Sequence, residues 1–164
     1  MKTQFEVNTQ CVFVQHSVHI ESPIAAINAV LAEGPRKWFP HFDGPAHAEL
    51  GPQFAGVGFR TKVTIGVGEP LSTGDWTKIP VTWQATFIKR LFPVMTGKVE
   101  LVPVDPHTTR LTVSGMYQPP LGGLGKQLDD AFMHRVAEAT VRDLAESIAM
   151  RIEAAASDAV TEPV

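Results

Sequence analysis

Residues 126–154 read KQLDDAFMHRVAEATVRDLAESIAMRIEA and contain neither glycine nor proline. Alanine, leucine, glutamate and arginine, which all favour helices, are frequent in this stretch. Its apolar residues recur mostly at four-residue steps, which is helical spacing. They are Leu128, Phe132, Val136, Val141, Leu144, Ile148 and Ile152. The pattern predicts one long helix with an apolar stripe, followed by a frayed tail over residues 157–164.

The chain before this helix alternates between apolar and polar residues, as half-buried strands do. Residues 11–21 show the pattern most clearly. One face of this strand carries Val12, Val14, His16, Val18 and Ile20. Further strands are expected over residues 46–50, 54–67, 77–88, 97–103 and 109–118. Their short connections, which include a turn over residues 69–74, require antiparallel pairing.

Two helical segments are expected between the first two strands. Ser22-Pro23 suits a helix start, and Glu33-Gly34-Pro35 ends that helix. Between these signals, Ile24, Ile27, Val30 and Leu31 follow helical spacing. The segment 36–42, which contains Trp38, Phe39, His41 and Phe42, then predicts a second, brief helix or an ordered loop.

These elements predict an α+β fold in which an antiparallel sheet of about six to seven strands wraps around the long helix. A helix is ~10–12 Å wide and strands lie ~4.8 Å apart, so one helix cannot cover such a sheet flat. A curled sheet leaves an apolar cavity beside the helix unless large residues such as Trp83 and Phe87 fill it. The length of 164 residues fits one domain over 1–164, with its core at about residues 11–154.

The order of elements resembles the helix-grip fold of the START-like (SRPBCC) superfamily. This superfamily includes the birch-pollen-allergen-like proteins and the polyketide cyclase/dehydrase and lipid-transport group. VHIESP at 18–23 is similar to that group's first strand and helix start, and YQPPLGGLG at 117–125 to its entry into the last helix. The resemblance covers about residues 11–154. It implies that the first and last strands pair and that an apolar ligand lies between sheet and helix, but it implies no single activity.

Composition excludes several classes of function. Hydrophobic residues make up 44% and charged residues 19%, and the net charge is −3, which argues against nucleic acid or an anionic membrane as the main partner. The single cysteine, Cys11, cannot form an internal disulfide and is expected to be a small hydrophobe in a strand. Residues 1–10 do not resemble a signal peptide, and no apolar run approaches the ~20 residues of a spanning helix. The default expectation is a cytoplasmic protein.

His16 and Tyr117 are the candidates for chemistry, because both are expected on inward faces of their strands. If the first and last strands pair, both side chains could reach one cavity and lie near each other. His16 could be a core histidine bonded to Tyr117 or to the backbone, a ligand contact, or an acid/base group near neutral pH. Asp129 either faces the sheet, where it could bind a polar ligand group or pair with Thr61 or Tyr117, or lies in water and complements the helix dipole.

The other residues expected to line the pocket are mainly large and apolar. Trp38 and His41 belong to the aromatic segment, which either covers the pocket or packs as an ordinary short helix. Trp83 and Phe87 face inward on a middle strand, as core residues or as a ligand platform. The remaining expected lining residues are Phe59, Thr61, Phe132, Met133 and Val136.

No motif predicts a metal or an organic cofactor. The sequence contains no His-Glu-x-x-His, no paired Cys-x-x-Cys, no phosphate loop and no nucleophile elbow. His16 and His19 are expected on opposite faces of one strand, so they cannot share a metal.

The leading functional hypothesis is binding or transport of a hydrophobic small molecule, such as a lipid, an isoprenoid or a polyketide-like compound. A second hypothesis is a polyketide cyclase or dehydratase that uses His16 and Tyr117 as acid/base groups. A third is a protein-interaction domain that uses the outer face of the sheet. The sequence predicts neither the ligand's identity nor the oligomeric state.

Overall fold

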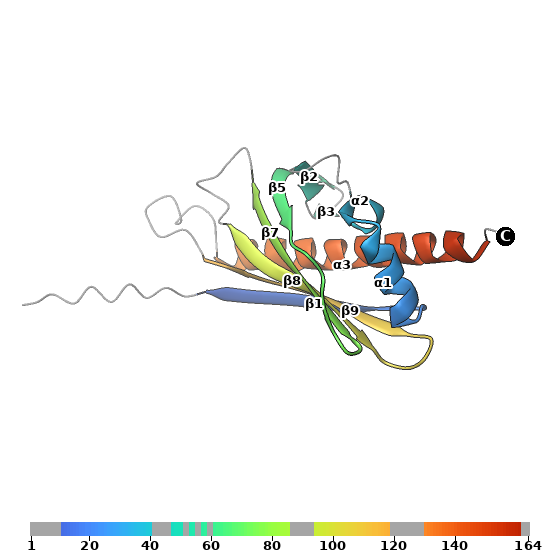
Figure 1. The fold of residues 1–164 in the computed structure, drawn as a ribbon. Coiled ribbons are helices and arrows are strands. Elements are labelled where there is room, and N and C mark those ends of the chain that lie inside the picture. Colours follow the sequence, from blue (N-terminus) through green and yellow to red (C-terminus); the bar gives the residue numbers. More distant parts are fainter. Residues whose placement is uncertain are drawn as a thin grey trace, which may run out of the picture.

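In the computed structural model, strands from both ends of the chain build one antiparallel sheet that lies along the helix α3 (Asp130–Thr161) (Figure 1). The structure describes residues 11–40, 47–50, 53–54, 57–58, 61–85, 94–118 and 130–161. Within these ranges the sheet has seven strands in the order β1-β9-β8-β7-β5-β2, with β6 paired to β7. The strands are β1 Val12–Ile20, β2 His47–Leu50, β5 Thr61–Val67, β6 Leu71–Thr73, β7 Trp76–Ala85, β8 Met95–Pro103 and β9 Thr109–Tyr117. The predicted α+β architecture, a curved sheet around a long C-terminal helix, is confirmed.

The alternation along β1 is confirmed in the burial of its side chains. Val14 and Ile20 are buried and the other three inward residues are partly buried, whereas the intervening side chains are exposed. β1 pairs along its whole length with β9, which joins the first strand to the last. Because α3 packs most extensively against β1, the inward face of this strand meets the helix directly.

Two short helices follow β1, as predicted: α1 (Ile24–Ala32) and α2 (Pro35–Trp38). Gly34 separates them with a φ of 100°, a conformation that favours glycine. Two hydrogen bonds hold this region to the sheet. Thr77 Oγ1 on β7 donates to Asn28 Oδ1 on α1 at 2.9 Å, and Thr109 Oγ1 on β9 donates to the Ser22 carbonyl oxygen at 2.8 Å.

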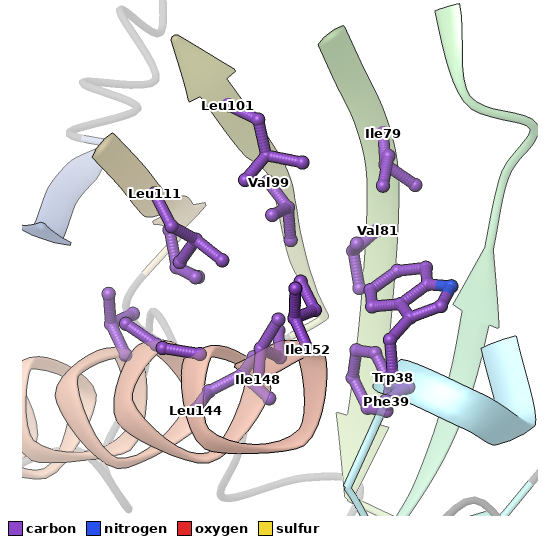
Figure 2. Close-up of a cluster of buried hydrophobic side chains, with 14 of the residues drawn as sticks. Trp38, Phe39, Ile79, Val81, Val99, Leu101, Leu111, Leu144, Ile148 and Ile152 are labelled. Atoms are coloured by element: carbon purple, nitrogen blue, oxygen red, sulfur yellow. The ribbon is translucent and has the colours of Figure 1, made fainter. Parts of the chain in front are cut away.

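The core lies between the inner face of the sheet and α3 (Figure 2). The predicted stripe on α3 is confirmed for its described part, because its members have no more than 1% of their surface exposed. They are Val141, Leu144, Ile148 and Ile152. The facing side chains come from three adjacent strands and are Ile79, Val81, Val99, Leu101 and Leu111. Burying one such side chain fully contributes about 1.5–3 kcal/mol, so this contact is a main source of stability.

The long strand predicted over residues 54–67 is wrong. In its place, β3 (Gln53–Phe54) pairs with β4 (Val57–Gly58) in a separate two-stranded sheet, and β5 begins only at Thr61. β4 ends at Gly58, and glycine weakens the interior of a strand. The predicted turn over 69–74 also contains the short strand β6, which forms a hairpin with β7.

The helix α3 continues past the predicted start of the tail. Residues 157–161 are helical and not frayed, and Ala156 is buried just before them. Polar Ser157 and Asp158 suggested an end to the helix, but no glycine or proline stops it before Pro163. No helix in the described ranges is both long and apolar enough to cross a membrane.

Cys11 also differs from its prediction. It is exposed and immediately precedes β1, so it is not a buried residue within the strand. The alternation that begins at residue 11 does not show where backbone pairing starts, and here pairing starts at Val12 opposite Tyr117.

Candidate functional site

The register of the sheet arranges its inward side chains in transverse rows. One row consists of Ile65, Trp83, Met95, Tyr117 and Val12. The next row consists of Val67, Val81, Gly97, Gly115 and Val14. A third row consists of Ile79, Val99, Val113 and His16. These three rows contain no carboxylate, ammonium or guanidinium group, so the surface that faces α3 is almost entirely apolar.

Trp83 lies against two glycines in the middle of this surface. A Cβ on Gly97 would lie 3.1 Å from Trp83 Cζ3, and a Cβ on Gly115 would lie 3.1 Å from Trp83 Cη2. The same Cβ on Gly115 would lie 3.1 Å from Met95 Cε. The indole therefore spans β8 and β9 in the space that two side chains would otherwise take. Trp83 is 5% exposed, as its predicted inward position requires.

His16 and Tyr117 do not lie near each other. Both face inward as predicted, but β1 pairs His16 with Val113 and Val12 with Tyr117. Four residues along a strand separate the two positions, which corresponds to about 13 Å. Side chains that stand nearly perpendicular to the sheet do not span that distance, so a direct hydrogen bond between the two is excluded. The expectation of a close pair is wrong because alternation fixes the face of a residue but not its register.

His16 and Tyr117 also differ in their surroundings. Tyr117 is 4% exposed in the row that contains Trp83 and Met95. His16 is only partly buried, because β1 is the edge strand of the sheet. His16 is therefore an inward-facing but not a fully enclosed histidine.

Trp38 contributes the largest buried side chain from outside the sheet and α3. It ends α2 and is 1% exposed, and the Phe39 ring meets it edge to face at 5.7 Å between centroids. Its indole Nε1 is buried without a hydrogen-bond partner, and no other side-chain nitrogen or oxygen in the described ranges has this property. Such a group costs about 1–3 kcal/mol when nothing pairs with it.

Several predicted lining residues cannot be placed. His41, Phe59, Phe87 and Asp129 lie outside the described residues. The backbones of Thr61 in β5 and of Phe132, Met133 and Val136 in α3 are described, but their side chains are not. For all eight positions, the assignment to the pocket stays a prediction.

Two carboxylates with shifted pKa values lie outside the inward rows. Burial raises the pKa of Asp143 on α3, against the opposing effect of Arg142. In the loop between β8 and β9, the backbone N–H of His107 donates to Asp105 at 2.8 Å and lowers the pKa of that carboxyl. Neither group adds charge to the apolar surface that faces α3.

Comparison with solved structures identifies the fold. A conserved protein from Geobacillus kaustophilus matches with a TM-score of 0.54 at 16% identity, covering 90% of this chain and 97% of that one. Norcoclaurine synthase from Thalictrum flavum matches at 0.53 and 13% identity, covering 95% and 90%. The Zhui aromatase/cyclase from Streptomyces sp. R1128 matches at 0.50 and 15% identity, covering 92% and 96%. The chain has the START-like helix-grip fold. No protein-family model and no curated protein matches its sequence.

Within this START-like fold, sequence reasoning missed Met95, Gly97 and Gly115 as parts of the interior. The two glycines carried a usable signal, because glycine inside a strand often marks a close approach of another group. Nothing in the sequence indicated that the approaching group is Trp83, since β7 meets β9 only through β8.

Proposed function

We propose that this chain binds a hydrophobic small molecule between the inner face of its sheet and α3. The observation that carries the proposal is the chemistry of the three inward rows, which offer apolar surface and no charged group. Ligand sites for hydrophobic molecules combine such surface with a few polar groups that set orientation. His16, Tyr117 and Trp38 supply polar atoms of this kind around the apolar rows.

Solved structures of the same fold support the proposal. One is a point mutant of norcoclaurine synthase in complex with a transition-state analogue, with a TM-score of 0.54 at 10% identity. That protein holds a small molecule, and its likeness to this chain extends over 95% of the chain. A lipid, an isoprenoid or a polyketide-like compound fits the apolar rows equally well, so transport of such a molecule belongs to the same proposal.

A cyclase or dehydratase is the second candidate, because the Zhui aromatase/cyclase shares the fold. The separation of His16 from Tyr117 counts against a cooperating acid/base pair. Catalysis would then use one of the two alone, with His16 favoured because it faces inward and is only partly buried. A protein-interaction role has less support, since the outer face of β1 and β9 exposes only a small apolar pair, Phe13 at 53% and Met116 at 48%.

Native mass spectrometry of protein purified gently from its own host tests the proposal. We expect a discrete added mass that is lost on denaturation. A fluorescent apolar probe, 1-anilinonaphthalene-8-sulfonate, should bind the purified protein and be displaced by fatty acids or polyprenols. Trp83→Ala should change probe affinity, whereas Met116→Ala on the outer face should not. A bare protein mass together with no saturable probe binding would contradict the proposal.

A further inference from the structure

The indole N–H of Trp38 is a buried hydrogen-bond donor. The side chain is 1% exposed, and its Nε1 has no partner in the described part of the chain. In Figure 2 the nitrogen lies on the side of the ring away from Leu144, Ile148 and Ile152, so an acceptor for it would lie beyond the contact between the sheet and these α3 residues. Buried polar groups in proteins are nearly always paired, so an orphaned donor calls for an acceptor that the described residues do not supply.

The polar side chains that connect α1 to the sheet already form hydrogen bonds with one another. Thr77 Oγ1 donates to Asn28 Oδ1 at 2.9 Å, and Ser72 Oγ lies 3.0 Å from Thr77 Oγ1. The ring next to Trp38 is Phe39, which offers no acceptor oxygen. An indole N–H can only donate, so its partner must be an acceptor.

We propose that Trp38 Nε1 donates a hydrogen bond to an acceptor oxygen of the ligand, and that the ligand is therefore an oxygenated hydrophobe and not a pure hydrocarbon. A ketone, quinone, ester or ether oxygen meets this requirement. The inference rests on the proposed function and narrows its ligand class. It also explains why a tryptophan stands where a phenylalanine would fill much of the same space without burying a donor.

A matched pair of probes separates the hydrogen bond from apolar burial. Fluorenone and fluorene have nearly the same shape, and fluorenone carries a carbonyl where fluorene carries a methylene group. The quantity to compare is the Kd of fluorene divided by the Kd of fluorenone. We expect this ratio to be about three- to tenfold larger in the wild type than in Trp38→Phe, which is the range for one neutral hydrogen bond. Trp76→Phe, at an exposed position, is the control and should leave both Kd values unchanged.

A measurement on the wild-type protein makes the test independent of any variant. The chain contains three tryptophans, so a proton–nitrogen correlation spectrum shows up to three indole signals. Fluorenone should move the proton signal of Trp38 downfield, and fluorene should not produce that shift. This spectrum decides the question even if Trp38→Phe does not fold.

The outcomes distinguish the inference from the proposed function. If both probes bind, but Trp38→Phe leaves their Kd ratio unchanged and the Trp38 signal responds equally to both, the ligand-acceptor role is wrong and the proposed function stands. If neither probe binds at saturating concentration, and no other hydrophobe does, both are wrong. A carbonyl-specific shift with a lowered ratio in Trp38→Phe supports both.

Discussion

Thr77 on β7 donates a hydrogen bond to Asn28 on α1, and it does so from a position with 0% exposure. The bond crosses 49 positions of sequence and fixes the first helix against the middle of the sheet. Because α2 follows α1 directly, this contact also helps to set the place of Trp38.

Asn28→Ala should therefore lower the free energy of unfolding. It removes one hydrogen bond of the buried Thr77 hydroxyl, which keeps Ser72 Oγ at 3.0 Å as a partner, so the loss should be about 0.5–1.5 kcal/mol. Ser17→Ala provides a matched control, because Ser17 Oγ and Thr112 Oγ1 form a 2.8 Å hydroxyl pair on the exposed face. That control should cost no more than about 0.5 kcal/mol. Urea unfolding of both variants checks the prediction, and equal losses would contradict it.

The two glycines beneath Trp83 should differ in their tolerance of alanine. A Cβ on Gly97 would overlap the backbone carbonyl oxygen of Ser114, which cannot move without disturbing β9. A Cβ on Gly115 meets only side-chain atoms, of Met95 and Trp83, at its closest contacts of 3.1 Å. We expect Gly97→Ala to destabilise by more than about 3 kcal/mol and Gly115→Ala by about 1–3 kcal/mol.

A second substitution tests the cause of the smaller effect. Trp83→Phe should reduce, but not abolish, the cost of Gly115→Ala, because it removes the indole atoms that the new methyl group meets and leaves the Met95 contact in place. It should not reduce the cost of Gly97→Ala, whose main clash is with backbone. Thermal unfolding of the single and double variants measures the coupling of Trp83→Phe with each glycine substitution. Equal coupling energies for Gly97→Ala and Gly115→Ala would contradict this explanation.

His16 and Tyr117 should act independently of each other. Their positions are about 13 Å apart along the paired strands, beyond the range at which substitutions usually couple. The effects of His16→Leu and Tyr117→Phe on the free energy of unfolding should add within about 0.5 kcal/mol in the double variant. A larger coupling energy would show that the two side chains communicate despite the register.

Asp143 should make stability depend on pH in a defined direction. Burial raises its pKa above the ordinary value of 3.8, so the folded state binds the proton more tightly than the unfolded chain. The stabilisation that comes from this tighter proton binding is fully present below pH 3.8 and is lost as pH rises through the folded pKa. Asp143→Asn should thus raise the Tm at neutral pH relative to the wild type, with the difference vanishing in acid.

Asp105 provides the control of opposite sign. The backbone N–H of His107 lowers its pKa, so its contribution is present above the ordinary value of 3.8 and is lost as pH falls through the folded pKa. Asp105→Asn should lower the Tm at neutral pH, and this difference should also vanish in acid. Both effects should be small, because Asp105 is fully exposed and the Asp143 side chain is 41% exposed. Scanning calorimetry of both variants across pH measures them.

The sequence predictions were correct for features that depend on interactions within one element, and they failed for several features that depend on contacts between elements. The inward face of β1 and the stripe of α3 were predicted correctly, because each depends on a local period that one element imposes by itself. The prediction of one continuous strand through Phe54 and Thr61 failed, because apolar and polar residues alternate across this stretch although β3 and β4 pair with each other in a separate sheet. The tail after Ser157 was also misjudged, because polar composition does not end a helix that is still packed through Ala156.

The sequence alone predicted the order of the main strands and helices and the apolar faces of β1 and α3, but it did not predict β3, β4 and β6 as separate strands. The antiparallel sheet around a long helix follows from those properties, since every apolar face needs a cover. The tertiary structure alone decided the register that separates His16 from Tyr117, the indole of Trp83 across Gly97 and Gly115, and the unpaired N–H of Trp38. Each of these depends on which residues of distant strands and helices meet. Such meetings are fixed by pairing and packing across the whole fold, and no local period in the sequence encodes them.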